Sequence, residues 1–269
     1  MKMVKKILLG MTAAATIMAF FGCKMIDDSK GAIKGWDNNY TVDFENDTKE
    51  QYRAYESTNF NHAGALVKVT FKNVEAGNYS KMGAIFDLEE KDGKRSFYIM
   101  GLAGTSDYNF YISRFEKVTD IQAENFGTAD GAVETKVWDK TKDNGIGSIT
   151  RPAKDANGNV TYYLYYKAFK NPEENPTKGY WEWAVFGFDE TQAEQAKTAV
   201  KKADCNLTEL KKINSSLKDG TIENAFDLGT LKAIPQNKVA VYAKIDAGKT
   251  LTGSWQYFDT YKEAEEVEE

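Results

Sequence analysis

The chain has 269 residues, of which 42% are hydrophobic, 28% charged and 13% aromatic, a composition that excludes disordered and low-complexity proteins. Its formal net charge is −5, and it becomes −8 (−5 − 3) if residues 1–22, which carry three lysines and no acidic residue, are removed. An acidic domain repels phosphate backbones, so we expect no nucleic-acid partner.

The first 22 residues have the pattern of an export signal. Three lysines at positions 2, 5 and 6 precede an apolar run over residues 7–21. This run is shorter than the roughly 20 residues of a membrane-spanning helix. A short basic segment followed by a short apolar one is typical of a secretion signal. We therefore expect residues 1–22 to be removed on export.

The export signal ends at Gly22 and Cys23. These two residues resemble the lipobox of bacterial lipoproteins, and Phe20 and Phe21 give it the looser form seen in spirochaete lipoproteins. The resemblance implies that Cys23 receives a diacylglycerol, carries acyl chains such as palmitate and becomes the mature N-terminus. Several acyl chains together hold a protein firmly at a membrane. The alternative is an ordinary cleaved signal with an incidental cysteine.

Residues 23–35 are polar and predict a tether between the lipid and a folded domain. Lys24 stands where an aspartate often retains lipoproteins at the inner membrane, so we expect the outer membrane, on its periplasmic or surface side. Residues 261–269 form an acidic tail. Residues 36–260 contain no repeat and no domain boundary, and we expect them to form one domain.

Most of this domain is predicted to form β-strands. Residues 65–72 alternate between apolar and polar side chains, with Val67, Val69 and Phe71 on one face. Turns containing glycine and aspartate separate the next runs, as in antiparallel hairpins. Further strands are expected at residues 82–89, 96–102, 108–115, 132–138, 160–169, 180–188, 238–245 and 254–258.

Residues 189–217 change to helical spacing and predict a short helical insertion. Asp189 with Gln192 resembles a capping box, and Asn206 with Glu209 forms a second pair of this kind. Strands lie on both sides of the insertion. The insertion is therefore expected to belong to the β domain.

The fold class that follows is mainly β, an antiparallel two-sheet sandwich of about ten strands. The runs at residues 83–87, 97–101, 108–115 and 239–243 resemble laminin-G and concanavalin A-like jelly-roll sandwiches. The resemblance implies binding of carbohydrate or protein on a sheet face or loop rim, and some members are glycosidases. Fold alone does not decide between these functions.

Several kinds of site lack the residues that they need. His62 is the sole histidine, which excludes multi-histidine metal sites, and no nucleophile elbow accompanies it. Asp155 and Gly158 have the spacing of a hairpin turn, not of an EF-hand. Cys205 is predicted to be a buried small hydrophobe. We expect no cofactor and no metal, although calcium held by separate loops stays open.

One strand offers carboxylates in a pattern close to that of a glycosidase. Laminarinase-type sandwich enzymes carry Glu-x-Asp-x-Glu on one strand, which places three carboxylates on one sheet face. Asp87 and Glu89 fit this pattern, but Ile85 stands at the nucleophile position. We therefore interpret these residues as a solvated strand face and expect no enzyme.

Trp181 and Trp183 share one face of a predicted strand, and Tyr163 and Tyr165 raise the same question on the neighbouring strand. If they are exposed, they are candidates for a ligand-binding platform that stacks on sugar rings. If they are buried, they belong to the core, where such large side chains are strongly stabilising. The sequence leaves both interpretations open.

The functional hypothesis is a lipid-anchored, non-catalytic surface binding or adhesion module. Its expected partners are the membrane, through the lipid, and a glycan or an extracellular protein. Two alternatives remain, a sandwich-type glycoside hydrolase and a structural envelope lipoprotein without a specific ligand.

Overall fold

The computed structural model describes residues 33–36, 38–45, 49–105, 110–121, 126, 131–138, 149–171, 177–227 and 237–260, with the backbone alone at 57–62, 237–239 and 259. The predicted export signal, Cys23 and the acidic tail lie outside these residues. Within the described part of the chain, no helix is long and apolar enough to cross a membrane.

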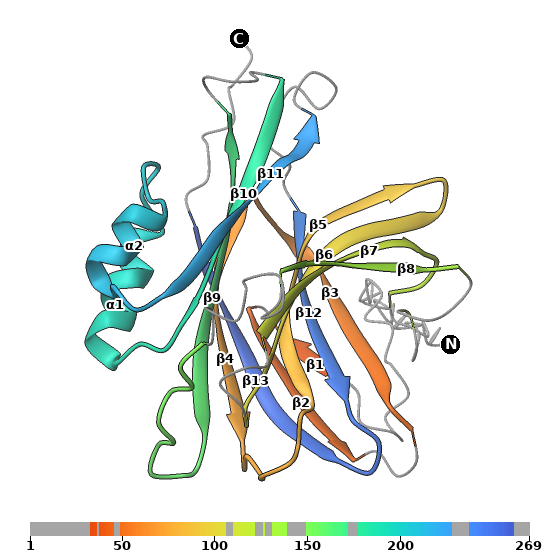
Figure 1. Cartoon of the computed structure of the whole chain (residues 1–269), viewed down its shortest axis with the longest axis vertical. Helices are drawn as coiled ribbons and strands as arrows, with labels where there is room; N and C mark the ends of the chain where they lie inside the picture. Colours follow the sequence, from red (N-terminus) through yellow and green to blue (C-terminus); the bar gives the residue numbers. More distant parts are fainter. Residues whose placement is uncertain are drawn as a thin grey trace, which may run out of the picture.

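Two antiparallel sheets pack face to face (Figure 1). The seven-stranded sheet has the order β1-β2-β13-β4-β9-β10-β11, and the six-stranded sheet has the order β3-β12-β5-β6-β7-β8. Their strands are β1 (Ile33–Trp36), β2 (Asn39–Glu45), β3 (Gln51–His62), β4 (Gly64–Lys72), β5 (Lys81–Lys91), β6 (Lys94–Ala103), β7 (Phe110–Val118), β8 (Val133–Trp138), β9 (Val160–Lys170), β10 (Lys178–Phe186), β11 (Lys218–Asp227), β12 (Asn237–Ile245) and β13 (Thr250–Asp259). The predicted antiparallel sandwich is confirmed.

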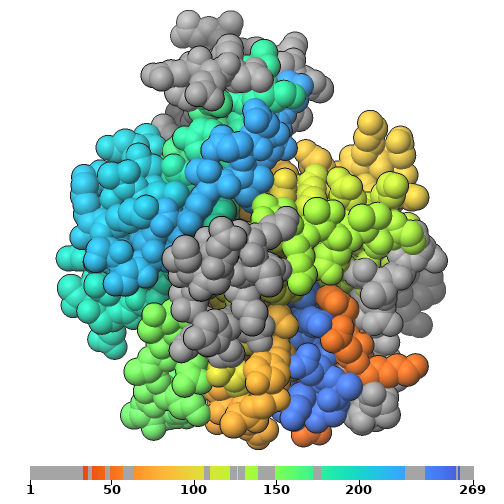
Figure 2. All heavy atoms as spheres, viewed as in Figure 1, coloured from red at the N-terminus to blue at the C-terminus, as the bar shows by residue number. Residues whose placement is uncertain are grey.

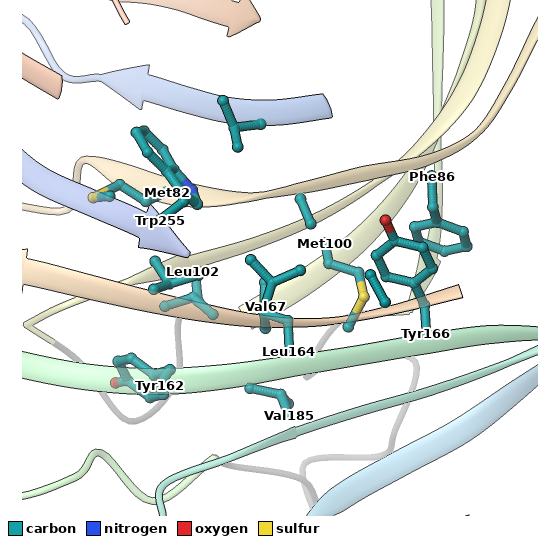
Figure 3. Packing of buried hydrophobic residues seen from close by; sticks show 14 of the residues in the cluster. Val67, Met82, Phe86, Met100, Leu102, Tyr162, Leu164, Tyr166, Val185 and Trp255 are labelled. Carbon is teal, nitrogen blue, oxygen red and sulfur yellow. The ribbon is translucent and has the colours of Figure 1, made fainter. Parts of the chain in front are cut away.

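The main core lies between the two sheets, where every second side chain of each strand points inward. β2 shows the alternation most clearly, because buried and exposed residues take turns along its whole length. Figure 3 shows Val67 and Leu164 of the seven-stranded sheet among side chains of the six-stranded sheet, including Met100 and Leu102. Burial of these apolar side chains, each contributing about 1.5–3 kcal/mol, holds the sheets together.

A helical pair covers part of the outer face of the seven-stranded sheet (Figure 1). It consists of α1 (Glu190–Ala199) and α2 (Leu207–Ile213), between β10 and β11. Asp189 and Gln192 form the predicted capping box, and the side chain of Asn206 accepts a hydrogen bond from the Glu209 N–H. The predicted insertion and both caps are confirmed.

Polar side chains of the sheet fasten this pair. The Lys167 ammonium donates to the carbonyls of Ala203 at 2.9 Å and Cys205 at 3.0 Å. The Glu182 carboxylate accepts from the Leu207 N–H at 2.9 Å, at the start of α2. Cys205 itself is buried, as predicted, and burial raises the pKa of its thiol to about 11. The thiol therefore stays protonated at neutral pH.

Four strands, β1, β2, β3 and β11, lie outside the predicted strand segments. β11 is an edge strand whose buried side chains are only Ile222 and Phe226, so it carries little apolar pattern. β1 begins at Ile33, inside the segment 23–35 that is predicted to be a tether, and it pairs with β2. The folded domain therefore starts earlier than the predicted boundary at residue 36.

Candidate functional site

The four aromatic residues predicted as a candidate platform are all buried. Trp181 is 0% exposed and Trp183 2%, and both lie in the core between the sheets. Tyr163, at 4%, and Tyr165, at 0%, lie under the helical pair. The core interpretation is therefore correct for the two tryptophans, and none of the four offers a surface for ligand. Spacing places such residues on one face, but it does not tell which face is covered.

Asp87 does not lie on a solvated strand face as predicted. Its backbone has φ +55°, and the pairing of β5 with β6 shifts register between Phe86 and Glu89, so a β-bulge interrupts the alternation. The Asp87 side chain is 0% exposed and accepts from Arg114 at 2.9 Å. The bulge lies at the base of the β5–β6 hairpin, which projects from the body in Figure 2 (yellow).

Arg114 neutralises both carboxylates of this strand. It also pairs with Glu89 at 3.2 Å, and its guanidinium carbon lies 4.6 Å from the centroid of the Tyr98 ring. Burial raises the pKa of Asp87 to about 6, while the Arg114 charge acts in the opposite direction. A retaining glycosidase needs two carboxylates facing substrate, whereas Asp87 is enclosed and paired.

Asp155 lies in a tight turn, as predicted, but the turn precedes β9 and does not join two paired strands, because β8 belongs to the other sheet. The Asp155 carboxylate accepts from the N–H groups of Asn157 at 2.8 Å and Asn159 at 2.9 Å, and Gly158 has φ +80°. These hydrogen bonds lower the pKa of Asp155. Among the described residues, no group of three or more histidine, cysteine, aspartate or glutamate side chains could hold a metal ion.

The outer face of the six-stranded sheet carries an apolar cluster that continues into a group of polar side chains. Ile121 and Phe126 cover Phe97 and Phe115, and all four are nearly inaccessible. The ring centroid of Phe126 also lies 5.4 Å from that of Tyr52 and 6.1 Å from that of Tyr242. Beside this cluster lie Tyr52, Lys81, Tyr111, Tyr242 and Lys244, which together we call the tyrosine face. It draws on strands β3, β12, β5 and β7.

A row of two tyrosines and two glycines forms the centre of the tyrosine face. Tyr242 pairs in register with Gly83, Gly83 with Gly101, and Gly101 with Tyr111. A Cβ atom added to Gly83 would meet the Met100 carbonyl oxygen, so this glycine allows close approach of the β6 backbone. The hydroxyls of Tyr111 and Tyr242 meet at 2.8 Å. A Cβ atom added to Gly101 would lie 2.7 Å from the Tyr111 ring. The glycine is therefore required for the Tyr111 position.

The tyrosine pair keeps hydrogen-bonding capacity for a third group. Two hydroxyls carry two hydrogens, and the bond between them uses one. Tyr242 is 0% exposed, whereas Tyr111 is half-buried and reaches the surface. Tyr111 thus holds part of its aromatic side chain at the surface in a fixed position.

Charged side chains surround the pair. Lys244 pairs with Glu50 at 2.8 Å, and its ammonium lies 5.6 Å from the centroid of the Tyr52 ring. Lys81 lies 5.8 Å from the centroid of the Tyr111 ring. On the β7–β8 side, Ser113 donates to Glu134 at 2.7 Å. The tyrosine face therefore combines aromatic, hydroxyl, ammonium and carboxylate groups within one part of the sheet.

The tyrosine face was not predicted from the sequence, although segments of β5, β6, β7 and β12, which carry its central row, were predicted as strands. Because successive residues of a strand face opposite sides of the sheet, Gly83 lies on the outer face, between neighbours that face the core. The same holds for Gly101, Tyr111 and Tyr242. Their meeting depends on the register across four strands, which no local pattern in the sequence gives.

Comparisons with known proteins find a distant similarity to a solved lectin-like structure. The chain is similar to the legume lectin-like domain from Entamoeba histolytica, with 11% identity over 86% of this chain and 88% of that chain and a TM-score of 0.35. No family model and no curated protein sequence matches the chain. The similarity is too low to transfer any residue role.

Proposed function

We propose that this protein is a non-catalytic binding module held at a membrane by lipid on Cys23, and that the tyrosine face holds its ligand. The observation that carries the proposal is the Tyr242–Gly83–Gly101–Tyr111 row, in which Gly101 makes space for the Tyr111 ring and the two hydroxyls meet at 2.8 Å. A glycine in a strand interior weakens the strand, so a glycine at the point where it seats the Tyr111 ring favours a functional use.

A glycan is the ligand class that this chemistry favours. Sugar rings have an apolar C–H face and a periphery of hydroxyls that both donate and accept hydrogen bonds. Tyr111 and Tyr52 offer ring surface, and the tyrosine pair and Glu134 offer acceptors beside the donors Lys81 and Lys244. Ligand sites typically pair apolar surface with a few placed polar groups in this way.

We propose binding without catalysis because of where the carboxylates of Asp87 and Glu89 lie. Asp87 is enclosed, and Arg114 holds both Asp87 and Glu89. Neither carboxylate is placed to attack a sugar or to protonate a leaving group. We therefore favour binding over hydrolysis at this sheet.

A glycan array tests the binding part. The detergent-purified full chain is applied beside Tyr111→Phe, which removes one hydroxyl from the tyrosine face, and Tyr180→Phe, which removes a half-buried hydroxyl from the other sheet. We expect the wild-type chain and Tyr180→Phe to bind the same glycans and Tyr111→Phe to lose most of the signal. Absence of binding to every glycan would reject the proposal in favour of a structural envelope lipoprotein.

Labelling with palmitate tests the anchor. Cells that express the wild-type chain are expected to yield labelled protein in the membrane fraction, because acylated Cys23 partitions into the bilayer. Cys23→Ser should lose the label, whereas Cys205→Ser should keep it, since Cys205 is buried. A Cys23→Ser protein that stays labelled and membrane-bound would contradict the anchor.

A further inference from the structure

We infer that the ligand is an acidic glycan, with a carboxylate seated at Lys81 beside the Tyr111 ring. This inference rests on the proposed function and adds the substrate class to it. Lys81 opens β5 and extends over the tyrosine face, where its ammonium contacts the Tyr111 ring at 5.8 Å and the Tyr79 carbonyl at 3.4 Å.

Lys81 and Lys244 are direct neighbours, but their ammonium groups have different partners. The two residues pair in register across β5 and β12. Lys244 has the Glu50 carboxylate at 2.8 Å. Within the described residues, Lys81 has no carboxylate within 4.0 Å, and a backbone carbonyl at the edge of hydrogen-bonding distance is its polar contact. The pair of lysines thus leaves one positive charge without a counter-charge in direct contact.

The surroundings of Lys81 make that charge costly. Its side chain is half-buried, and burial lowers the pKa of Lys81, as do the positive charges of Lys244 and Lys136. Asp246 and Glu50 act in the opposite direction from farther away. A ligand carboxylate at this point would restore the interactions that burial removes, because opposite charges in partly desolvated surroundings attract strongly.

The charges around Lys81 are mixed, in a chain whose net charge is −5. Lys244 and Lys136 lower the pKa of Lys81, whereas Asp246 and Glu50 raise it. Because Lys244 is paired with Glu50, Lys81 is the member of this lysine pair whose ammonium can take a ligand carboxylate as its direct partner. An amino group next to aromatic surface and hydroxyls matches a sugar acid, in which the carboxylate is attached to a ring with hydroxyl groups.

A paired array decides this inference. It carries oligosaccharides that contain uronic or sialic acids and, for each, the same oligosaccharide with its carboxylates reduced to alcohols. The probe is the detergent-purified full chain. We expect about 10-fold to 100-fold stronger binding of the acidic member of the pair, which corresponds to one hydrogen bond to a charged group, with a decrease at high salt.

Three variants assign the effect to Lys81. Lys81→Met is expected to lose the preference for the acidic member, and Lys81→Arg is expected to keep it. Lys68→Met is the matched control, because Lys68 is a half-buried lysine on the outer face of the other sheet. Equal binding of both members by the wild-type chain would overturn the inference and leave the proposed function standing. No binding to either member or to neutral glycans would reject the proposed function itself.

Discussion

The two sheets share one core, but their outer faces use polar residues in opposite ways. On the seven-stranded sheet, Lys167 and Glu182 turn toward the helical pair and bond to its backbone. On the six-stranded sheet, no helix of the described part of the chain covers the tyrosine face, and Lys81 contacts the Tyr111 ring and one distant carbonyl there. Lys167 and Glu182 are bonded to the backbone of the helical pair. The polar groups of the tyrosine face can still form hydrogen bonds and ion pairs with a ligand.

This contrast separates stability from binding. A change under the helical pair removes contacts that hold the fold and leaves the tyrosine face in place. A change on the tyrosine face alters a surface that the fold needs less. The predictions below test that separation, from the largest expected effect on stability to the smallest.

Leu210→Ala should have the largest effect. Leu210 is 0% exposed between α2 and the seven-stranded sheet, so the truncation leaves a cavity. We expect the free energy of unfolding in urea to fall by about 2–5 kcal/mol. Lys212→Ala on the exposed side of the same helix should change it by less than about 0.5 kcal/mol. Glycan binding of the folded Leu210→Ala protein should equal that of the wild-type chain, and a parallel loss of binding would refute the separation.

Gly101→Ala should lower both the stability of the fold and the binding of glycan. Its Cβ would lie 2.7 Å from the Tyr111 ring, so the ring must move and the bond to Tyr242 is lost. We expect a loss of about 1–3 kcal/mol in the free energy of unfolding, typical of overpacking, together with weaker glycan binding.

A double-mutant cycle with Tyr111→Ala checks the cause of that loss. If the collision with the ring is responsible, Gly101→Ala should cost much less in the Tyr111→Ala background. Equal costs in both backgrounds would show that Gly101 acts through the strand and not through Tyr111.

Asp87→Asn should change the pH dependence of stability. The pKa of Asp87 is raised from 3.8 to about 6 by burial, so the folded state takes up a proton at a higher pH than the unfolded state does. The proton therefore stabilises the fold fully below about pH 4, and this gain is lost as the pH rises through about 6. The full gain is about 3 kcal/mol, of which about 2 kcal/mol is present at pH 4.5. Asparagine tolerates the positive φ at this position.

The measurement is the difference in unfolding free energy between the wild-type chain and Asp87→Asn at pH 4.5 and pH 7.5. The free energy of unfolding of the wild-type chain should rise relative to that of Asp87→Asn at the lower pH. A relative loss at the lower pH would mean that the ion pair with Arg114 outweighs burial and that the pKa of Asp87 is lowered.

Features of the fold that depend on neighbouring residues could be predicted from the sequence, whereas features that depend on distant strands could not. The caps at Asp189 and Asn206 are local patterns, and both were predicted correctly. Alternation identified most strands with a clear apolar face. It did not identify β2, although buried and exposed residues alternate along it, or β11, whose sequence is mostly polar. Sequence spacing put Trp181 and Trp183 on one face without showing that the opposite sheet covers it.

Asp87 and the tyrosine face show why the rest could not be predicted. Strict alternation placed Asp87 beside Ile85 on an outer face, and the bulge with φ +55° turns it inward. The partners of Tyr111 are brought together by register across strands that are far apart in sequence, with 131 positions between Tyr111 and Tyr242. Such contacts are set by the whole sheet.

Fluorine NMR of the chain labelled with 3-fluorotyrosine tests the central claim most directly. Resonances of Tyr111, Tyr180 and Tyr257 are assigned with the respective phenylalanine variants, and the acidic glycan with the strongest array signal is added. We predict a shift at Tyr111 and none at Tyr180 or at Tyr257, which lines a separate groove of about 420 Å³ beside α1. A shift at Tyr257 with Tyr111 unchanged would contradict the claim that the tyrosine face binds the ligand.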